Sequence, residues 1–238
     1  MPGWLLKILR FLITVLVPVV LTLTAVRAML SPWYLEFEYR TPMFPDDYYG
    51  FTMGERLAYG RVAVEYLVND AGIEFLGDLR FPEGQETPAP SCANMVDCTY
   101  MYNDRELEHM LDVKNVVQGA LRVWIAAFIL LVTFGFWAWK EEWLPDYLQA
   151  VRRGGLLTII LIGVILLLVV AAFGFIFVNF HRIFFAEGTW TFLYSDTLIR
   201  LFPQRFWRDT FFMVGGLSAA LGWLVWFVLG RIQRRNNG

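Results

Sequence analysis

The sequence has few charged residues and only two histidines, and each shortage excludes certain classes of protein or site. Only 18% of the 238 residues are charged and 57% are hydrophobic, a composition too apolar for an ordinary soluble domain. The net charge of −2 gives no indication of a nucleic-acid partner. The two histidines are too far apart for the i, i+4 spacing of a helical zinc motif. The G-x-S-x-G motif of serine hydrolases is also missing.

Long apolar runs fill much of the chain. Crossing the hydrocarbon core of a bilayer takes ~20 apolar residues, and four segments approach that length. No cleavage pattern follows the first run, so we expect an uncleaved helix there. The sequence predicts an all-α polytopic membrane protein, a single membrane domain with a large external loop region between helices 1 and 2. The predicted spans are about 5–28, 115–139, 155–179 and 210–230, with an external loop region at 30–114 and an external interfacial loop at 180–209.

The orientation follows from basic residues in the short flanks of the spans, because these favour the cytoplasmic side. On that basis we expect both termini in the cytoplasm of a bacterial cell and the loops at 30–114 and 180–209 outside. The flanks predicted to be cytoplasmic carry Lys7, Arg10, Lys140, Arg152, Arg153, Arg231, Arg234 and Arg235.

The predicted external region has several local features. Pro32, Pro42 and Pro45 favour an extended stretch after the first span. Thr52 begins a capping box for an amphipathic helix, and Asn103 is suited to cap the helix that leads into span two. The two cysteines, Cys92 and Cys98, are expected to form a disulfide that pins only a local turn, with free thiols as the alternative.

The two histidines are predicted to lie at the same side of the membrane. His109 precedes span two and His181 follows span three, so two crossings separate them. Asp112 lies three residues after His109 on the same helical face, where a carboxylate can orient an imidazole. The alternative is that both histidines are simple polar tips at the membrane interface.

Three stretches of the sequence resemble a known family. They are GERLAYGRVAVEYL (54–67), MYNDRELEHMLDVKNV (101–116) and NFHRIFFAEGTWTFLYSDTLIRLFPQRFWRD (179–209). With four helices in the same order, the chain resembles the lipoprotein intramolecular transacylase (Lit) family of bacterial integral membrane proteins. The most specific elements are HMxDVK at 109–114 and FHxxFF, Trp and DTLIRLFP within 180–203. The segment around the cysteines matches no part of that pattern and is interpreted as a local addition.

The resemblance implies an acyltransferase. Its substrate would be a diacylglyceryl-modified lipoprotein, whose sn-2 acyl chain moves to the α-amine of the N-terminal cysteine to give the lyso-form. The two histidines of the family correspond to His109 and His181. Lipoprotein and membrane lipids are then the expected partners. No cofactor and no metal ion are expected, with a two-histidine-one-carboxylate set of His109, Asp112 and His181 as the weaker alternative.

Imidazole suits the proton transfers of such a reaction near neutral pH. We expect His181 to take the amine proton, and His109, oriented by Asp112, to polarise the carbonyl or protonate the leaving oxygen; exchanged roles fit the sequence equally well. The candidates for substrate binding are Arg105, Lys114, Arg122, Arg182, Trp190 and Arg200.

Other functions are compatible with the sequence. Ser195 and His181 share one loop region, which leaves open a serine-dependent lipid hydrolase with an acyl-enzyme. A non-catalytic membrane scaffold or envelope sensor with an acidic external region is the third possibility. Asp196 is expected to pair with Arg200 as a brace within the loop rather than to act in chemistry.

Overall fold

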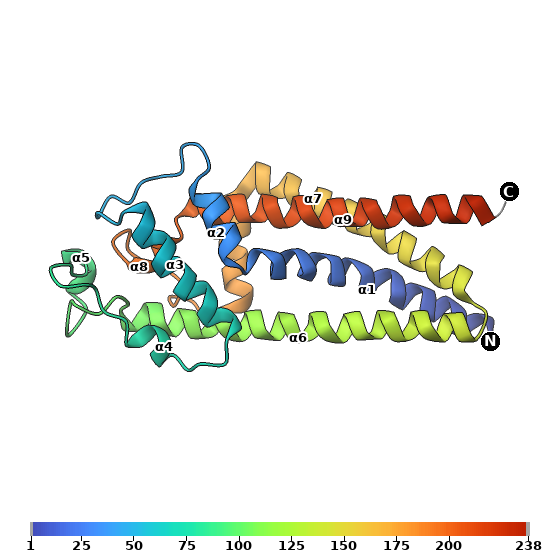
Figure 1. Cartoon of the computed structure of the whole chain (residues 1–238), viewed down its shortest axis with the longest axis horizontal. Coiled ribbons are helices and arrows are strands. Elements are labelled where there is room, and N and C mark those ends of the chain that lie inside the picture. Colours follow the sequence, from blue (N-terminus) through green and yellow to red (C-terminus); the bar gives the residue numbers. More distant parts are fainter. Residues whose placement is uncertain (1, 237–238) are drawn as a thin grey trace. The chain divides into compact units, whose positions relative to one another are not determined.

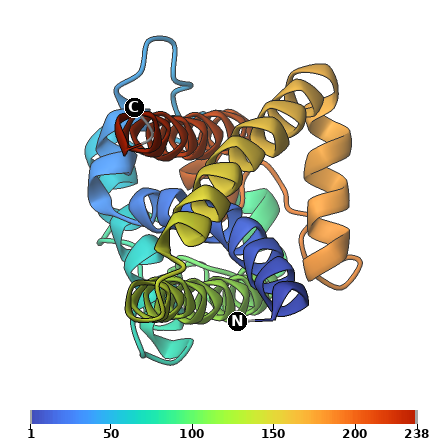
Figure 2. The same ribbon diagram turned by 90° about the vertical axis from the view of Figure 1, so that its right-hand side faces the viewer.

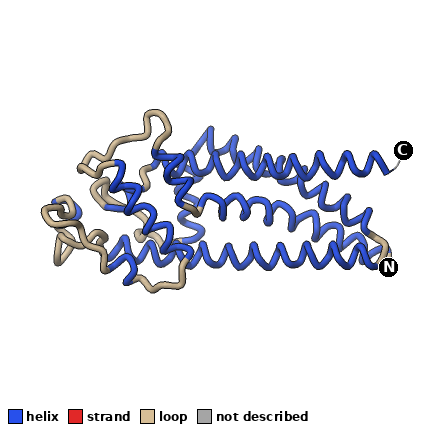
Figure 3. Tube along the Cα trace, viewed as in Figure 1, coloured by secondary structure: helices blue, strands red, loops and turns tan. Residues whose placement is uncertain are grey.

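The computed structural model describes residues 2–236, and every regular element in that range is a helix (Figure 3). A single bridge between Arg80 and Tyr100 is the only strand-like pairing of the described chain. The helices are α1 Gly3–Met29, α2 Pro32–Tyr39, α3 Met53–Val68, α4 Glu74–Gly77, α5 Ala89–Cys92, α6 Asp104–Lys140, α7 Leu144–Phe184, α8 Thr197–Leu201 and α9 Gln204–Asn236 (Figure 1).

The contacts group the chain into two compact units. Within the described residues, unit 1 comprises the chain up to Ala28, Ala120–Ala171, and the chain from Phe211 onward. Unit 2 comprises Met29–Gly119 and Ala172–Thr210. Helix α7 has a non-helical residue, Ala172, where it passes from one unit to the other.

Four helices, α1, α6, α7 and α9, are long and apolar enough to cross a membrane, in agreement with the predicted number of spans. An apolar run becomes helical in lipid because the helix satisfies every backbone N–H and C=O internally. Each of the four predicted spans lies inside one of these helices. Within unit 1, α1 runs between α6 and α9 in both views (Figure 2).

Unit 1 packs through small residues and a few side-chain hydrogen bonds. A methyl group built on Gly222 of α9 would lie 2.8 Å from the carbonyl oxygen of Gly155 in α7, so the two backbones nearly touch. Glycine permits such an approach, which membrane helices use because lipid gives no hydrophobic drive to association. Hydrogen bonds from Trp124 Nε1 to Thr24 Oγ1 (3.0 Å) and from Arg10 Nη1 to Asp146 Oδ1 (3.1 Å) join α1 to α6 and α7.

The segment between α1 and α6 is not one large loop, because it contains α2, α3, α4 and α5. The expected extended stretch after the first span is wrong where α2 forms. Pro32 begins that helix, and a proline at the first helical position is favourable because its φ is already helical and its missing N–H would have had no partner. The predicted capping boxes are confirmed: Thr52 pairs with Glu55 before α3, and Asn103 pairs with Glu106 at the start of α6.

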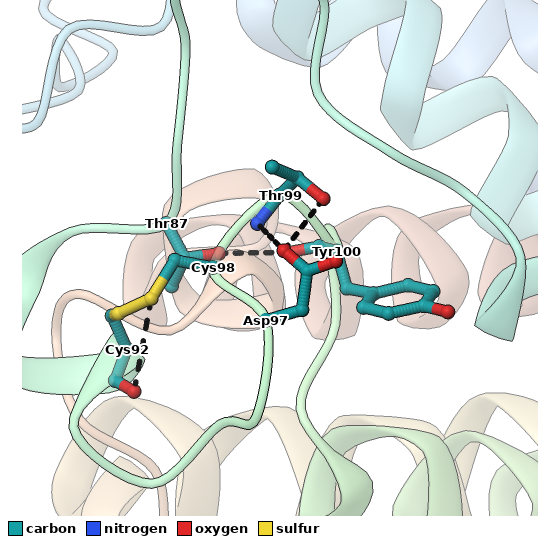
Figure 4. Close-up of a disulfide and its surroundings, with 6 residues drawn as sticks. All are labelled: Thr87, Cys92, Asp97, Cys98, Thr99 and Tyr100. Carbon is teal, nitrogen blue, oxygen red and sulfur yellow. Dashed lines mark hydrogen bonds between the residues drawn. A yellow bond between two sulfur atoms is a disulfide. The ribbon is translucent and has the colours of Figure 1, made fainter.

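The cysteine segment folds back on itself (Figure 4). Cys92 and Cys98 are joined by a disulfide, the pairing expected for these residues. Thr87 closes the same segment by donating its N–H to the carbonyl of Cys98 and its hydroxyl to the carbonyl of Tyr100, each at 2.8 Å. The segment does more than pin a turn, since Ser91 on α5 forms a buried hydrogen bond with Ser195 Oγ at 2.7 Å.

Candidate active site

His109 and His181 face one another within unit 2. The centroids of the two imidazole rings are 6.1 Å apart, and the ring planes differ by only 16°. His109 lies in the second turn of α6 and is 9% exposed, whereas His181 lies in the last turn of α7. Topology alone predicted that the two histidines share a side of the membrane, and the structure adds that they meet.

Aromatic rings surround the histidine pair. Phe185 contacts both imidazoles, at 4.9 Å from His109 and 5.5 Å from His181 between ring centroids. Phe192 lies 5.2 Å from His109, and Trp190 lies 5.0 Å from His181. A wall of this kind gives the imidazoles largely apolar surroundings.

The hydrogen bond of His181 fixes which nitrogen is available for chemistry. Its Nδ1 lies 2.8 Å from the carbonyl oxygen of Phe177, one turn earlier in α7. A carbonyl oxygen can only accept, so Nδ1 carries the proton and donates it. The Nε2 atom of a neutral His181 therefore keeps its lone pair and can accept a proton.

His109 has no comparable partner. Its Nδ1 is buried and makes no hydrogen bond to any described residue. Asp112 is half-buried and forms no hydrogen bond with that nitrogen. Orientation of His109 by Asp112 therefore stays a prediction.

Two buried carboxylates instead connect the start of α6 to the loop that carries Trp190 and Phe192. Asp196, fully buried, accepts hydrogen bonds from the N–H of Leu193 at 2.7 Å, Asn103 Nδ2 at 3.1 Å and Arg105 Nη2 at 3.3 Å. Glu106 accepts from the N–H of Leu198 at 2.7 Å through the oxygen that its capping box leaves free. From sequence alone Asp196 was expected only to brace its own loop, and the contact of Glu106 with that loop was not expected.

The expected pair between Asp196 and Arg200 is wrong. Arg200 forms a buried ion pair with Asp47, in which its Nη2 lies 2.9 Å from Oδ2 and both side chains are 3% exposed. The guanidinium also lies over Phe51, 3.4 Å from the ring centroid. Arg200 and Asp196 lie four residues apart, but their partners come from opposite ends of the segment between α1 and α6.

The other basic candidates have different surroundings. Arg105, one helical turn before His109, lies 5.7 Å from the centroid of Phe192 and is 41% exposed at its side chain. Lys114 is buried and bonds to Asn69 Oδ1 at 3.1 Å, so it holds the end of α3 rather than an open site. Arg182 is exposed next to His181. Arg122 is exposed and belongs to unit 1.

Ser195 is not placed as a nucleophile. Its side chain is buried, and its hydroxyl is paired with that of Ser91 rather than with an imidazole. An attacking serine needs a base within hydrogen-bond reach, so this arrangement does not favour the hydrolase. Between residues 2 and 236, no three His, Cys, Asp or Glu side chains are grouped as metal ligands would be.

Comparisons with known proteins identify relatives of this chain by sequence and by structure. The sequence profile of the lipoprotein intramolecular transacylase Lit matches residues 9–207. An uncharacterized protein of Aquifex aeolicus (strain VF5) is 27% identical over 98% of this chain and 99% of its own length. The in meso structure of the membrane integral Lit from Bacillus cereus shares the fold, with a TM-score of 0.78 at 18% identity over 99% of each chain.

Two further structures of the Bacillus cereus protein, in which one histidine is replaced by arginine or by alanine, also match. Each has a TM-score of 0.73 at 18% identity over 99% of this chain, and over 95% and 96% of the respective neighbours. The structural similarity is evidence for a shared fold, and the profile match over most of the chain is evidence for the family. The chain belongs to the lipoprotein intramolecular transacylase family of integral membrane acyltransferases.

Proposed function

We propose that this chain moves the sn-2 acyl chain of a diacylglyceryl lipoprotein to the α-amine of the lipoprotein's own N-terminal cysteine. The observation that carries the proposal is the pair of facing imidazoles inside an aromatic wall. Two proton-transfer groups among aromatic rings suit a reaction between an amine and the ester of an acyl chain.

His181 acts as the general base in this proposal. Its Nδ1 is committed to the carbonyl of Phe177, which leaves Nε2 to accept a proton. The amine nitrogen attacks the ester carbonyl carbon as Nε2 takes the amine proton. Proton transfer of this kind contributes ~10²–10⁴-fold to the rate.

His109 acts on the leaving oxygen. When the tetrahedral intermediate collapses, the C–O bond to glycerol breaks, and a proton from the imidazole pair converts the alkoxide to a hydroxyl. One proton leaves nitrogen and one arrives at oxygen, so the net change is an ester converted to an amide. Asp112 is assigned the orientation of His109 by its place on the same helical face, three residues further along α6.

No acyl-enzyme is needed, because ester and amine belong to one molecule and their proximity replaces a covalent carrier. The engagement of both cysteines in a disulfide and of Ser195 with Ser91 agrees with a direct transfer. Arg105 and Arg182, which border the histidines and are partly or fully exposed, are assigned to the polar part of the lipoprotein or to lipid headgroups.

The site is proposed to face the outside of the cytoplasmic membrane, with both chain termini in the cytoplasm. The support is the excess of Lys and Arg in the flanks named above.

The test is mass spectrometry of a lipoprotein N-terminal peptide from a host that leaves its lipoproteins diacylated. Co-expression of this chain should give an N-acylated cysteine with a monoacylglyceryl thioether. His181→Ala should abolish that product. Ile183→Ala, a control two residues away at a side chain that is 75% exposed, should retain it. An unchanged diacylglyceryl peptide beside folded, membrane-inserted protein would count against the transfer, and released fatty acid would favour hydrolysis.

A further inference from the structure

Three buried nitrogen atoms near the histidine pair have no hydrogen-bond partner among the described residues. They are Trp190 Nε1, Arg105 Nε and His109 Nδ1. Native proteins rarely leave buried polar atoms unpaired, and the exceptions often have a catalytic role. All three lie at or beside the imidazole pair, where a bound substrate can supply a hydrogen-bond partner.

The indole of Trp190 is the best placed of the three to act on an ester. Its ring lies 5.0 Å from that of His181, the proposed base, with an angle of 37° between the planes. The indole N–H is a donor only and carries no charge, so it can remain among aromatic rings until a substrate oxygen arrives. Among the other tryptophans, Trp124 uses the same N–H to bond Thr24 Oγ1 at 3.0 Å.

The other two nitrogens already have assignments. The guanidinium of Arg105 is held by Asp196 through Nη2. The imidazole of His109 is assigned to the leaving oxygen. An unpaired indole is not in itself a site, because Trp143 Nε1 is also unpaired but lies in an apolar cluster of unit 1 with Leu9 and Ile13. What distinguishes Trp190 is its contact with His181.

We propose that Trp190 is a catalytic residue whose indole N–H donates a hydrogen bond to the carbonyl oxygen of the substrate ester. The inference rests on the proposed transacylation. As the amine nitrogen bonds to the carbonyl carbon, the π electrons of the carbonyl move to its oxygen. The indole N–H stabilises that oxyanion without giving up its proton. When the C–O bond to glycerol breaks, the electrons return and the carbonyl of the new amide forms.

The loop network holds Trp190 in place for this task. Asp196 accepts the N–H of Leu193, three residues after Trp190, and ties the loop to Asn103 at the start of α6. Because α6 carries His109, the same network positions the indole relative to the imidazole of His109. Preorganised donors of this type account for a large share of catalysis in acyl transfer.

The first test is Trp190→Phe in the purified full-length chain, assayed with a synthetic diacylglyceryl-cysteine peptide. The variant keeps an aromatic wall and removes the N–H, so kcat should fall by ~10²-fold with little change in KM. Trp143→Phe, which removes the unpaired indole of unit 1, should leave kcat unchanged. A kcat for Trp190→Phe within about twofold of the unmodified chain would overturn the proposal.

The second test needs no substitution at Trp190. Biosynthetic replacement of tryptophan by 5-fluorotryptophan makes each indole N–H a stronger donor while it preserves the ring shape. The rate of the unmodified chain should rise, and that of Trp190→Phe should not. A rate that is unaffected by fluorination would overturn the proposal, even where Trp190→Phe fails to fold. If the unmodified chain forms no N-acyl product at all, the proposed function fails instead.

Discussion

Units 1 and 2 are stabilised by different contacts, although each consists of helices. In unit 1 the helices approach through glycines, as at Gly155 and Gly222, and isolated polar pairs such as Trp124 with Thr24 join them. In unit 2 buried charges and aromatic rings dominate, as in the Arg200–Asp47 pair and the rings around His181. Helices in lipid associate through close backbone packing, because lipid gives no hydrophobic drive to association. Buried charges, by contrast, are tolerated only where each has a partner of opposite charge.

Within unit 2, the residues proposed for catalysis differ from those that hold the fold together. His181 bonds through Nδ1 alone and His109 leaves its buried Nδ1 unpaired, whereas each oxygen of the Glu106 and Asp196 carboxylates accepts at least one hydrogen bond. The buried carboxylates thus fix the position of the loop, and the proposed catalytic residues His109 and Trp190 each keep an unpaired ring nitrogen. Changes to these two groups of residues should have different consequences.

The largest expected effect comes from removing both imidazoles. His109→Ala and His181→Ala should each lower kcat/KM by ~10²–10⁴-fold. The double variant should be no slower than the poorer single variant, because the two groups act in one reaction and their losses do not add. Steady-state rates of the three purified proteins test this, with unfolding temperatures as the control for structure. Losses that multiply in the double variant would mean that the histidines serve independent steps.

The next effect falls on stability rather than on catalysis. Asp47→Asn leaves the guanidinium of Arg200 buried without its carboxylate and should cost ~3–5 kcal/mol. The neighbouring Asp46 is exposed, so Asp46→Asn should change stability by less than ~0.5 kcal/mol. Unfolding by denaturant in detergent micelles measures both. Equal stability of the two variants would show that the ion pair does not stabilise unit 2.

Features that depend on the sequence within a few residues could be predicted. The apolar runs located the four long helices, and Thr52 and Asn103 marked the starts of α3 and α6. These predictions succeeded because hydrophobicity and capping act over a few residues. That the two histidines lie on one side of the membrane stays a prediction.

Features that depend on distant partners could not be predicted in this way. Arg200 finds Asp47 across 153 residues, and nothing near Arg200 distinguishes that partner from Asp196. Which aromatic residues of 180–209 touch an imidazole depends on how the loop returns, and the local sequence does not determine that path. Helix α2 was missed because proline was counted as a breaker, although Pro32 stands where a helix begins.

A pH effect should be confined to unit 2. Burial, reinforced by the nearby carboxylate of Asp209, raises the pKa of Glu38 in α2 from 4.5 to about 7, although Arg205 and Arg208 oppose the shift. A carboxyl group with a raised pKa binds its proton more tightly in the folded state. The contribution of Glu38 to the free energy of unfolding is therefore fully present below pH 4.5 and is lost as the pH rises through 7.

Stability measured from pH 5 to pH 8 should therefore fall by ~2 kcal/mol more in the unmodified chain than in Glu38→Gln, which stays neutral throughout. Glu36→Gln is the matched control on the same helix, because Glu36 is only half-buried and pairs with Arg61. Its pH dependence should match that of the unmodified chain. A Glu38→Gln variant with the same slope would mean that Glu38 is ionised in the folded protein.

The smallest effect tests the packing of unit 1. In Gly222→Ala the new methyl group would lie 2.8 Å from the carbonyl oxygen of Gly155 and 3.1 Å from Thr158 Cβ, so α7 and α9 must separate. Overpacking of this kind costs ~1–3 kcal/mol. Alanine recovers ~1 kcal/mol through its helix propensity, which leaves a net loss of about 1 kcal/mol.

Gly163→Ala on α7 has no described atom within 4 Å of the added methyl and gains the propensity alone. Thermal unfolding in detergent should therefore rank Gly163→Ala above the unmodified chain and Gly222→Ala below it. The reverse order would mean that close contact between α7 and α9 is not what stabilises unit 1.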